Sequence, residues 1–545
     1  MASSIPLRRT KGVVLLLAGS AALLVYLAYR STLTSKSKQF SSSTGTTDES
    51  PAHESAKREQ SPIQAGSTPE IHIGVDGDPK AVATHKNEDE QEDGNEENED
   101  EESDCDDFEK FRPIMAAIDL DKVKHAALEM RAQQRPYHNA DREGDVNGAL
   151  DCTIAEELHR GSFNLVYVVQ WSDGLKWILR VPGHGLEFDA NDVTRMNTEY
   201  RTMEYIRQHT TIPIPQVFSW EINCESIGVP FAFMSFVEGE PLYRVWYDKD
   251  KFSDDARSKL LSDLAAYMSQ LHKLEFPAMG MLQFQDPLAQ PTVGPIYARE
   301  VEFFQDGWGK HHVEGPYTSI SDHLLILLSR CEHRSKMSQS EEPLFKMIIE
   351  SIPKYLDGNG RFYLSPADFN VQNVMVNAAG EIKGIIDWDN VTTKPAAFGY
   401  ARYPLWLTRD WDPCSCVFNC EDDECTESKP QEFLRYRQHY AAAFAACSPK
   451  DYDPMMTKAS HILGAICMAL ESEIMRDGLL HQIMAFAFGG KPPFLLSDYV
   501  KSYVADDTAD KDKLLKVAFS RMWQEYGEWE EAEERTCQFL REEFG

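Results

Sequence analysis

The hydrophobic and polar positions of this chain follow different patterns in its successive parts. Residues 13–29 form an apolar run of seventeen residues that contains no charged side chain. Residues 31–107 are polar almost throughout and include few large apolar residues. From about residue 108, apolar positions recur with the periods expected of strands and helices. The pattern therefore predicts an apolar N-terminal segment, a polar linker and a folded region.

Short apolar runs separated by turn residues predict strands in the first part of the folded region. These strands are expected over residues 154–158, 165–170 and 176–181, and a buried strand that runs into a turn is expected over 231–239. A helix is expected to begin at Glu199 and to end near Gln208. It cannot continue through Pro213 and Pro215, since proline lacks the backbone N–H that a helix needs.

The later part of the chain is mostly helical in its pattern. Residues 254–274 place leucine and methionine at the spacing of one helix face. Further helices are predicted over residues 320–331, 344–352, 430–445, 455–476 and 511–540.

One stretch within this helical part, residues 362–390, returns to strands. Apolar runs predict strands over 362–364, 374–376 and 382–386, and the turn residues 377–380 separate the last two. These two strands are expected to pair as an antiparallel hairpin, which brings the start of its first strand beside the end of its second.

Polar residues stand at the open end of this predicted hairpin. Asn373 precedes its first strand and Asp387 follows its second, so their side-chain oxygens should converge. Such oxygens suit Mg²⁺ when phosphates supply its remaining ligands. Asp368 lies on the loop that leads into the hairpin, where it could act on a substrate hydroxyl as a general base or orienting group.

This arrangement resembles the catalytic core of the aminoglycoside phosphotransferase family, which has the protein-kinase-like fold. The family pattern is roughly His-Gly-Asp-x4-Asn, a hairpin, and Ile-Asp-Trp. Asp368, Asn373 and residues 386–388 match this pattern, whereas Pro366 stands in the place of the histidine. The run EYRTMEYIRQHTTIPIPQVFSW, residues 199–220, is similar to the fungal branch of the family.

The resemblance implies a bilobal α+β fold, with a β-rich N-lobe over residues 111–238 and a helical C-lobe over 239–545. It also implies ATP and Mg²⁺ as cofactors, and transfer of the γ-phosphoryl group to a hydroxyl of a small molecule. Asp368 would be the catalytic residue, and Asn373 and Asp387 the metal ligands.

The resemblance also implies which residues contact the nucleotide. The first turn, residues 159–164, would lie over the phosphates. Arg180 would stand in place of the family's lysine, with Glu199 as its acidic partner. The segment 231–239 would be the hinge between the lobes, and its backbone groups would bind adenine. The residues concerned are Gly161, Ser162, Phe163, Asn164, Arg180, Glu199, Ser235 and Val237. The departures at Pro366 and Arg180 leave an alternative open, a membrane-tethered pseudokinase-like binding or scaffold protein.

Charge and composition change this picture mainly outside the folded region. The net charge of −33 argues against a nucleic-acid-binding surface. Residues 88–107 alone contain fourteen acidic side chains, so much of the charge belongs to the linker. Residues 31–110 are therefore expected to be a disordered spacer, with an acidic partner-binding tail as the alternative. Protein partners are not indicated.

Residues 1–30 are expected to form a retained single-pass membrane anchor. The uncharged apolar run 13–29 is long enough for a membrane span, although at the short end, and no clear cleavage site follows it. No acidic residue precedes Asp48, which also suits a mitochondrial targeting region. The mitochondrial and endoplasmic reticulum membranes both remain open, and the kinase-like domain is expected in the cytosol or the mitochondrial matrix.

Four of the eleven cysteines cluster as Cys414, Cys416, Cys420 and Cys425. Their spacing departs from the usual pair of separated C-x2-C units of structural zinc sites. Zinc binding, disulfides and plain loop cysteines all remain open. The other cysteines are scattered, as is usual for reduced thiols.

Overall fold

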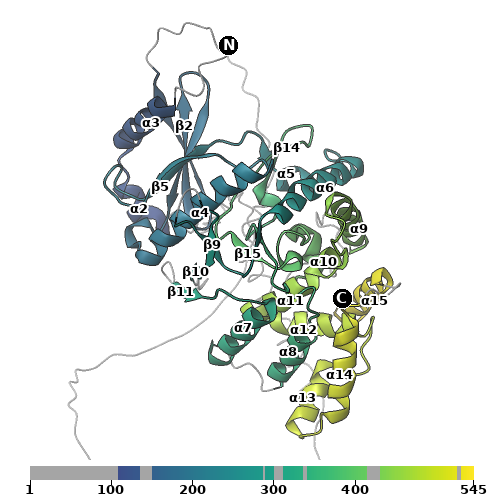
Figure 1. The fold of residues 1–545 in the computed structure, drawn as a ribbon. Helices are drawn as coiled ribbons and strands as arrows, with labels where there is room; N and C mark the ends of the chain where they lie inside the picture. Colours follow the sequence, from purple (N-terminus) through teal and green to yellow (C-terminus); the bar gives the residue numbers. More distant parts are fainter. Residues whose placement is uncertain are drawn as a thin grey trace, which may run out of the picture. The chain divides into compact units, whose positions relative to one another are not determined.

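Figure 1 shows the structure, a computed structural model. It describes residues 109–134, 150–285, 289–299, 311–334, 340–413, 430–524 and 529–544. The expected anchor, nearly all of the expected linker and the four clustered cysteines lie outside these residues. Within the described parts of the chain, no helix is both long and apolar enough to span a bilayer.

A five-stranded antiparallel sheet forms the N-lobe, in the order β1-β2-β3-β5-β4. Its strands are β1 (Cys152–Arg160), β2 (Asn164–Trp171), β3 (Lys176–Pro182), β4 (Val217–Glu221) and β5 (Phe231–Ser235). Side chains of β2 and β3 alternate between buried and more exposed positions, and the buried ones pack with Phe111 and Ile114. The four strands predicted here are confirmed, and β4 is an additional one.

Helix α4 (Ala190–His209) connects β3 to β4 and lies beside the sheet (Figure 1). Its end agrees with the prediction, but its start lies nine residues before Glu199, so the predicted start was wrong. Asp189 caps the helix: its carboxylate accepts from the backbone N–H of Asn191 at 2.7 Å and of Asp192 at 3.0 Å. This capping box fixes the start, although the first turn is polar and shows no apolar period.

Helices dominate the C-lobe. They are α5 (Tyr243–Trp246), α6 (Asp254–Ser269), α7 (Ile320–Arg334), α8 (Glu341–Glu350), α9 (Pro430–Cys447), α10 (Met455–Lys458), α11 (Ser460–Glu471), α12 (Glu473–Ala487), α13 (Leu496–Val504), α14 (Ala509–Arg521) and α15 (Trp529–Phe544), while α2 (Arg112–Ala117) and α3 (Leu120–Gln134) belong to the N-lobe.

Two predicted long helices are broken. The range 455–476 contains α10, α11 and the start of α12, because Ser472 takes an extended backbone (φ −124°, ψ 112°) that ends α11. The range 511–540 contains α14 and α15 as separate helices. Apolar periodicity continues across such breaks, so periodicity alone does not reveal them.

Small sheets join the lobes around the predicted hairpin, which is confirmed: β13 (Val374–Val376) pairs antiparallel with β14 (Ile382–Ile385). The other short strands are β6 (Glu240–Pro241), β7 (Glu275–Phe276), β8 (Met281–Gln283), β9 (Thr292–Gly294), β10 (Ile296–Arg299), β11 (His311–Glu314), β12 (Phe362–Ser365) and β15 (Thr392–Lys394). Strand β6 directly follows the expected hinge and pairs with β13, so the segment after the hinge belongs to the same sheet as the hairpin.

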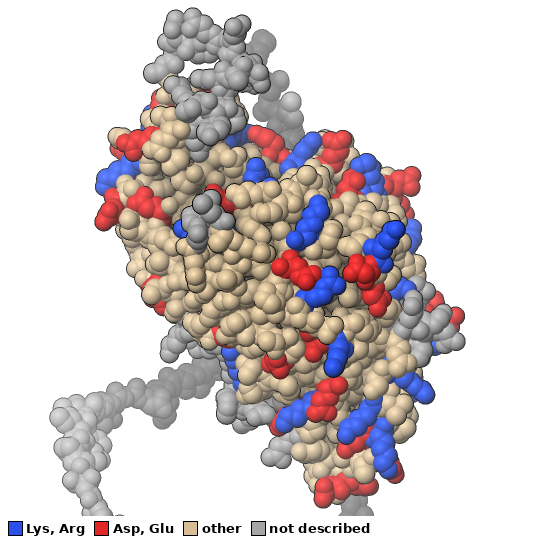
Figure 2. All heavy atoms as spheres, in the orientation of Figure 1, with Lys and Arg blue, Asp and Glu red and all other residues tan. Residues whose placement is uncertain are grey.

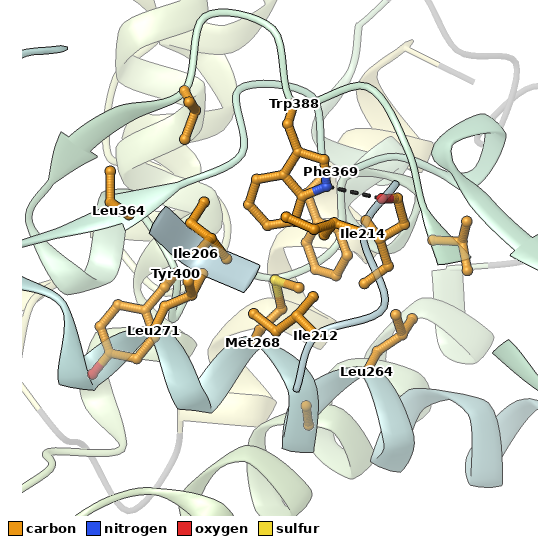
Figure 3. Close-up of a cluster of buried hydrophobic side chains, with 14 of the residues drawn as sticks. Ile206, Ile212, Ile214, Leu264, Met268, Leu271, Leu364, Phe369, Trp388 and Tyr400 are labelled. Atoms are coloured by element: carbon orange, nitrogen blue, oxygen red, sulfur yellow. Dashed lines mark hydrogen bonds between the residues drawn. The ribbon is translucent and has the colours of Figure 1, made fainter. Parts of the chain in front are cut away.

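A large apolar cluster packs against the hairpin, and Figure 3 shows some of its side chains. Trp388 is 1% exposed and packs among residues of both lobes, including Ile214 and Met268. Its indole Nε1 donates to the Ile385 carbonyl at 2.8 Å, which satisfies the buried N–H. The tryptophan therefore fixes the chain immediately after Asp387.

A buried ion pair ties α9 to the short helix η7 (Leu405–Trp411). Asp410 and Arg437 form two hydrogen bonds of 2.7 and 2.8 Å, and their side chains are 0% and 2% exposed. Removing Asp410 leaves the buried Arg437 only its longer ion pair with Glu533, at 3.6 Å, among the described carboxylates, so Asp410→Ala should lower the free energy of unfolding by about 3–5 kcal/mol.

Urea denaturation measures this loss. The matched control is Lys259→Ala, which breaks the exposed pair with Asp263 and should change the unfolding free energy by less than about 1 kcal/mol. Equal effects of the two variants would contradict this assignment.

Candidate active site

The structure brings Asp368, Asn373 and Asp387 together at the open end of the hairpin. The side-chain amide of Asn373 donates to the Asp368 carboxylate and to the Asp368 carbonyl, both at 3.0 Å. The backbone N–H of Ile386 donates to the Asn373 carbonyl at 2.8 Å, which joins the two ends of the hairpin. The amide oxygen of Asn373 remains an acceptor, because only its nitrogen is used in these bonds.

Asp387 stands two residues after the end of β14, with a left-handed backbone, φ 60°. Its side chain is 43% exposed. Loss of hydration and the neighbouring Asp389 carboxylate raise the pKa of Asp387 to about 6, against the opposing effect of Arg180. The charge of Asp368 acts in the same direction as Asp389. This crowding of carboxylates, beside an amide oxygen, fits a divalent cation, which would relieve their repulsion.

Asp368 lies deeper in the same group. Burial raises the pKa of its carboxyl above the usual value, while Arg402 and hydrogen bonds from Asn373 and Gln372 oppose that rise. The Gln372 amide donates to its Oδ2 at 2.8 Å, the same oxygen that Asn373 reaches. One oxygen of Asp368 is thereby held in place, and the other is available to accept a bond from a hydroxyl.

Arg402 supports the loop at the position where the family's histidine is missing. Its guanidinium donates to the carbonyls of Pro366 at 2.9 Å and Ala367 at 2.8 Å. These carbonyls immediately precede Asp368, so the arginine fixes the backbone from which the carboxylate projects. Sequence reasoning missed this residue, because it lies thirty-four positions after Asp368 and carries no motif of its own.

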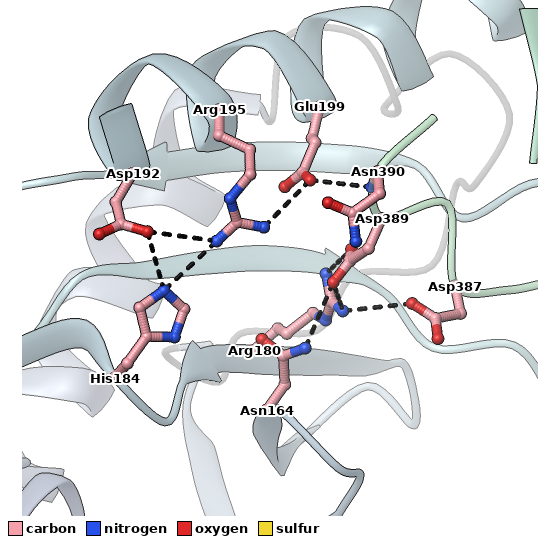
Figure 4. A network of polar contacts seen from close by, with 9 residues as sticks. All are labelled: Asn164, Arg180, His184, Asp192, Arg195, Glu199, Asp387, Asp389 and Asn390. Atoms are coloured by element: carbon pink, nitrogen blue, oxygen red, sulfur yellow. Dashed lines mark hydrogen bonds and ion pairs between the residues drawn. The ribbon is translucent and has the colours of Figure 1, made fainter. Parts of the chain in front are cut away.

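Arg180 pairs with Asp389, as Figure 4 shows. Its two terminal nitrogens reach the two oxygens of Asp389 at 2.5 Å each, and one of them lies 3.4 Å from Asp387. This bidentate pair holds the pKa of Asp389 below its usual range, although burial alone would raise it. Arg180 thus enters the site from β3 and reaches the segment that follows the hairpin.

The expected ion pair between Arg180 and Glu199 was wrong. Glu199 accepts instead from Arg195 at 3.2 Å and from the backbone N–H of Asn390 at 2.9 Å. Burial raises the pKa of Glu199 to about 7, against the effect of Arg195. The reason for the difference is that Asp389 is nearer to Arg180 and occupies both of its terminal nitrogens. Helix α4 still contacts the catalytic segment, but through Asn390.

The first turn, between β1 and β2, reaches the site with one side chain. The Asn164 amide donates to Asp389 at 3.3 Å. The N–H of Gly161 bonds within the turn to the Asn164 carbonyl at 2.9 Å, and the Ser162 carbonyl accepts from Lys110. Phe163 is 45% exposed. In this conformation, the Gly161 N–H is not directed at a phosphate.

The hinge backbone is already partly used. The Ser235 N–H donates to the Gln216 carbonyl at 2.8 Å, and the Phe236 N–H to the Lys176 carbonyl at 3.4 Å. Val237 packs against the hairpin, because a Cβ added to Gly384 would lie 2.6 Å from a Val237 methyl group. Among the described residues, no acceptor bonds the Val237 N–H. Of the three N–H groups, this one is available to a nucleobase.

Known proteins give this geometry a family context. A family described as "Phosphotransferase enzyme family" matches residues 154–417. "Altered inheritance of mitochondria protein 9, mitochondrial" of Debaryomyces hansenii is 26% identical over 27% of this chain and 24% of the relative. The protein of that name from Komagataella phaffii is 21% identical over 60% of each chain. A subtelomeric hrmA-associated cluster protein of Aspergillus fumigatus is 26% identical over 27% of this chain and 30% of the relative.

These alignments span between a quarter and three fifths of the relatives' lengths. Among solved structures, the chain is similar to a macrolide 2'-phosphotransferase from Brachybacterium faecium. The two are 14% identical, with 65% of this chain and 96% of the other covered and a TM-score of 0.33.

Every residue at the hairpin end lies within the matched range 154–417, and so do Arg180 and Arg402. The matched range also contains the N-lobe sheet and the hinge. Residues 154–417 of this chain therefore match the phosphotransferase enzyme family, in agreement with the resemblance in its sequence.

Proposed function

We propose that this protein is an ATP- and Mg²⁺-dependent phosphotransferase that transfers the γ-phosphoryl group to a hydroxyl of a small molecule. The observation that carries this proposal is the convergence of Asp368, Asn373 and Asp387 at one end of the hairpin, opposite Arg180. A general base, two oxygen ligands and a phosphate-binding cation are the groups that phosphoryl transfer uses.

In this proposal Asn373 and Asp387 hold Mg²⁺, which neutralises charge on the phosphates when bound. Asp368 accepts a hydrogen bond from the acceptor hydroxyl and orients it toward the phosphate. Arg180 donates hydrogen bonds to a phosphate. For this it must give up at least one of its two hydrogen bonds to Asp389. Asn164 and the rest of the first turn cover the phosphates, and Val237 offers its N–H to adenine.

A second candidate, a pseudokinase-like scaffold, is favoured by one observation. Both terminal nitrogens of Arg180 already bond Asp389, so the phosphate clamp is neutralised within the protein. The substitution of the family's histidine by Pro366 points the same way, although Arg402 supports that part of the loop.

Melting of the full-length protein in Mg²⁺ and ATP separates the two candidates. Ligand that binds only the folded state stabilises it, by about 2.7 kcal/mol at a hundredfold excess over Kd. We expect the melting temperature to rise with Mg²⁺ and ATP together, and to rise less with ATP and EDTA. If millimolar Mg²⁺ and ATP leave the melting temperature unchanged, the phosphotransferase proposal is wrong and the scaffold is favoured.

The location of the protein is a proposal as well. The apolar run 13–29, the basic residues beside it and the lack of acidic residues before Asp48 support an N-terminal mitochondrial targeting or anchoring segment. The mitochondrial names of two relatives point to the same compartment. Residues 31–110 would then link this segment to an N-lobe over 111–238 and a C-lobe over 239–545.

A further inference from the structure

Two cations lie together beside the catalytic loop, at the two ends of the segment 394–402. Lys394 is the last residue of β15, and Arg402 follows the short helix η6 (Ala396–Phe398). Backbone bonds fold this segment back on itself, including Ala401 N–H to the Ala396 carbonyl at 3.0 Å and Arg402 N–H to the Gly399 carbonyl at 3.2 Å. Residues eight apart in sequence are thereby brought close, and their positive charges repel each other.

Lys394 has no anionic partner within the described part of the chain. Its ammonium group lies 5.1 Å from the centre of the Phe398 ring, and no described carboxylate lies within ion-pair distance. Burial and the charge of Arg402 lower the pKa of Lys394 to about 8. Desolvating an ammonium group without a partner is costly, so the site would be stabilised by an anion.

Arg402 is also incompletely paired. Its interaction with the carbonyls of Pro366 and Ala367 uses one terminal nitrogen, and its buried Nε has no hydrogen-bond partner among the residues that the structure describes. Burial lowers the pKa of Arg402 to about 10, although the charge of Asp368 opposes this shift. The guanidinium is therefore fixed beside Asp368 with donor capacity that the described residues do not fill.

The nearby acids do not neutralise this pair. Glu314 is bound by Arg330 at 2.5 Å. Burial raises the pKa of Glu471 above its usual value, although Lys394 and a bond with Cys467 oppose the rise. Neither carboxylate forms an ion pair with Lys394 among the described contacts. Asp368 offsets part of the charge of Arg402, whereas the charge of Lys394 has no ion pair among the described contacts and is left for a group from outside the chain.

We propose that Lys394 and Arg402 bind an acidic group of the acceptor, a carboxylate or a phosphate, while Asp368 orients its hydroxyl. This inference rests on the proposed function, since it names the class of acceptor for the same site. Strand β15 supports the geometry: Lys394 pairs with Tyr363 of β12, the strand that leads directly into the loop of Asp368. An amine in the same place would be repelled by both cations.

A small series of probes on one carbon frame tests the charge requirement. Glycerol is neutral, glycerate carries a carboxylate, glycerol 3-phosphate carries a phosphate, and 2-amino-1,3-propanediol carries an amine. Binding of each to full-length protein saturated with Mg²⁺ and ADP is measured by calorimetry. We expect glycerate or glycerol 3-phosphate to bind about 10-fold or more tightly than glycerol, and the amine to bind more weakly. Which of the two anions binds better distinguishes a carboxylate acceptor from a phosphorylated one.

Three variants connect this preference to Lys394. Lys394→Gln should lose about 10-fold in affinity for the anionic probes while keeping the affinity for glycerol. Lys394→Arg keeps the charge and should retain anion binding. Lys259→Gln, an exposed lysine paired with Asp263, is the matched control and should bind as the parent does.

Two results would overturn the inference. One is equal anion affinity of the parent and Lys394→Gln, and the other is no preference of the parent for the anionic probes over glycerol. The melting shift in Mg²⁺ and ATP reports separately on the proposed function. If that shift is present and anion preference is absent, the inference fails alone. If the shift is absent and anion binding depends on Lys394, the phosphotransferase proposal fails alone.

Discussion

Asp387→Asn should reduce the rate of phosphoryl transfer by about a thousandfold while leaving the fold intact. Asparagine keeps the size of the side chain but removes the negative charge that would hold Mg²⁺ between the protein and the phosphates. The side chain is 43% exposed, and the ion pair that the substitution weakens is the long one with Arg180, at 3.4 Å. Because the neighbouring carboxylates destabilise its charge, the metal-free protein should be no less stable after the change.

Two measurements check this prediction. Formation of ADP from ATP gives the rate, with water as the acceptor if no better one is known. The Mg²⁺-dependent part of the ATP melting shift gives metal binding, and it should disappear in Asp387→Asn.

Asp389→Asn is the matched control, two residues further on. It removes the partner of Arg180 but leaves both proposed metal ligands, so the Mg²⁺-dependent shift should remain. If Asp389→Asn loses the shift and Asp387→Asn keeps it, the assignment of the two carboxylates is reversed.

The predictable part of the site is the part encoded within a short stretch of sequence. Asn373 and Asp387 are separated only by a hairpin, and antiparallel pairing necessarily brings its ends together. The same reasoning placed Asp368, since its loop leads directly into the hairpin. Local pattern and turn chemistry therefore sufficed for these three residues.

The partner of Arg180 needed information that local pattern does not contain. Arg180 and Asp389 are 209 positions apart, so only the packing of the lobes decides between Asp389 and Glu199. A signal was present, because Asp387 and Asp389 flank the apolar Trp388. Burial of the tryptophan leaves the two flanking carboxylates for the site, where both contact Arg180.

Arg402 illustrates a different limit. An isolated arginine near the end of a proline- and glycine-containing segment has no distinguishing sequence pattern. Its role depends on the backbone bonds of residues 396–402, which turn the chain back toward Pro366 and Ala367. The start of α4 was missed for a related reason, since Asp189 and Asp192 cap the helix through side-chain bonds rather than apolar spacing.

Asp368→Asn should lower kcat by about 100- to 10,000-fold while leaving the melting shift in Mg²⁺ and ATP close to that of the parent. The asparagine is the same size and can still accept a hydrogen bond, but it cannot take up the proton of the acceptor hydroxyl. The bonds from Asn373 and Gln372 both end on Oδ2 of Asp368, so the oxygen of an asparagine can keep them. The loop should therefore hold its position.

Steady-state rates at saturating acceptor, together with nucleotide binding, separate this role from that of Asp387. Gln372→Ala removes one of the bonds that position Asp368 and should reduce kcat by less than about 10-fold, because the bond from Asn373 remains. If Asp368→Asn instead abolishes the Mg²⁺-dependent shift, the carboxylate belongs to the metal site. The general base must then be a different residue. Asp387, Asp389 and Glu199 do not suit this role, because each is paired with an arginine in this arrangement.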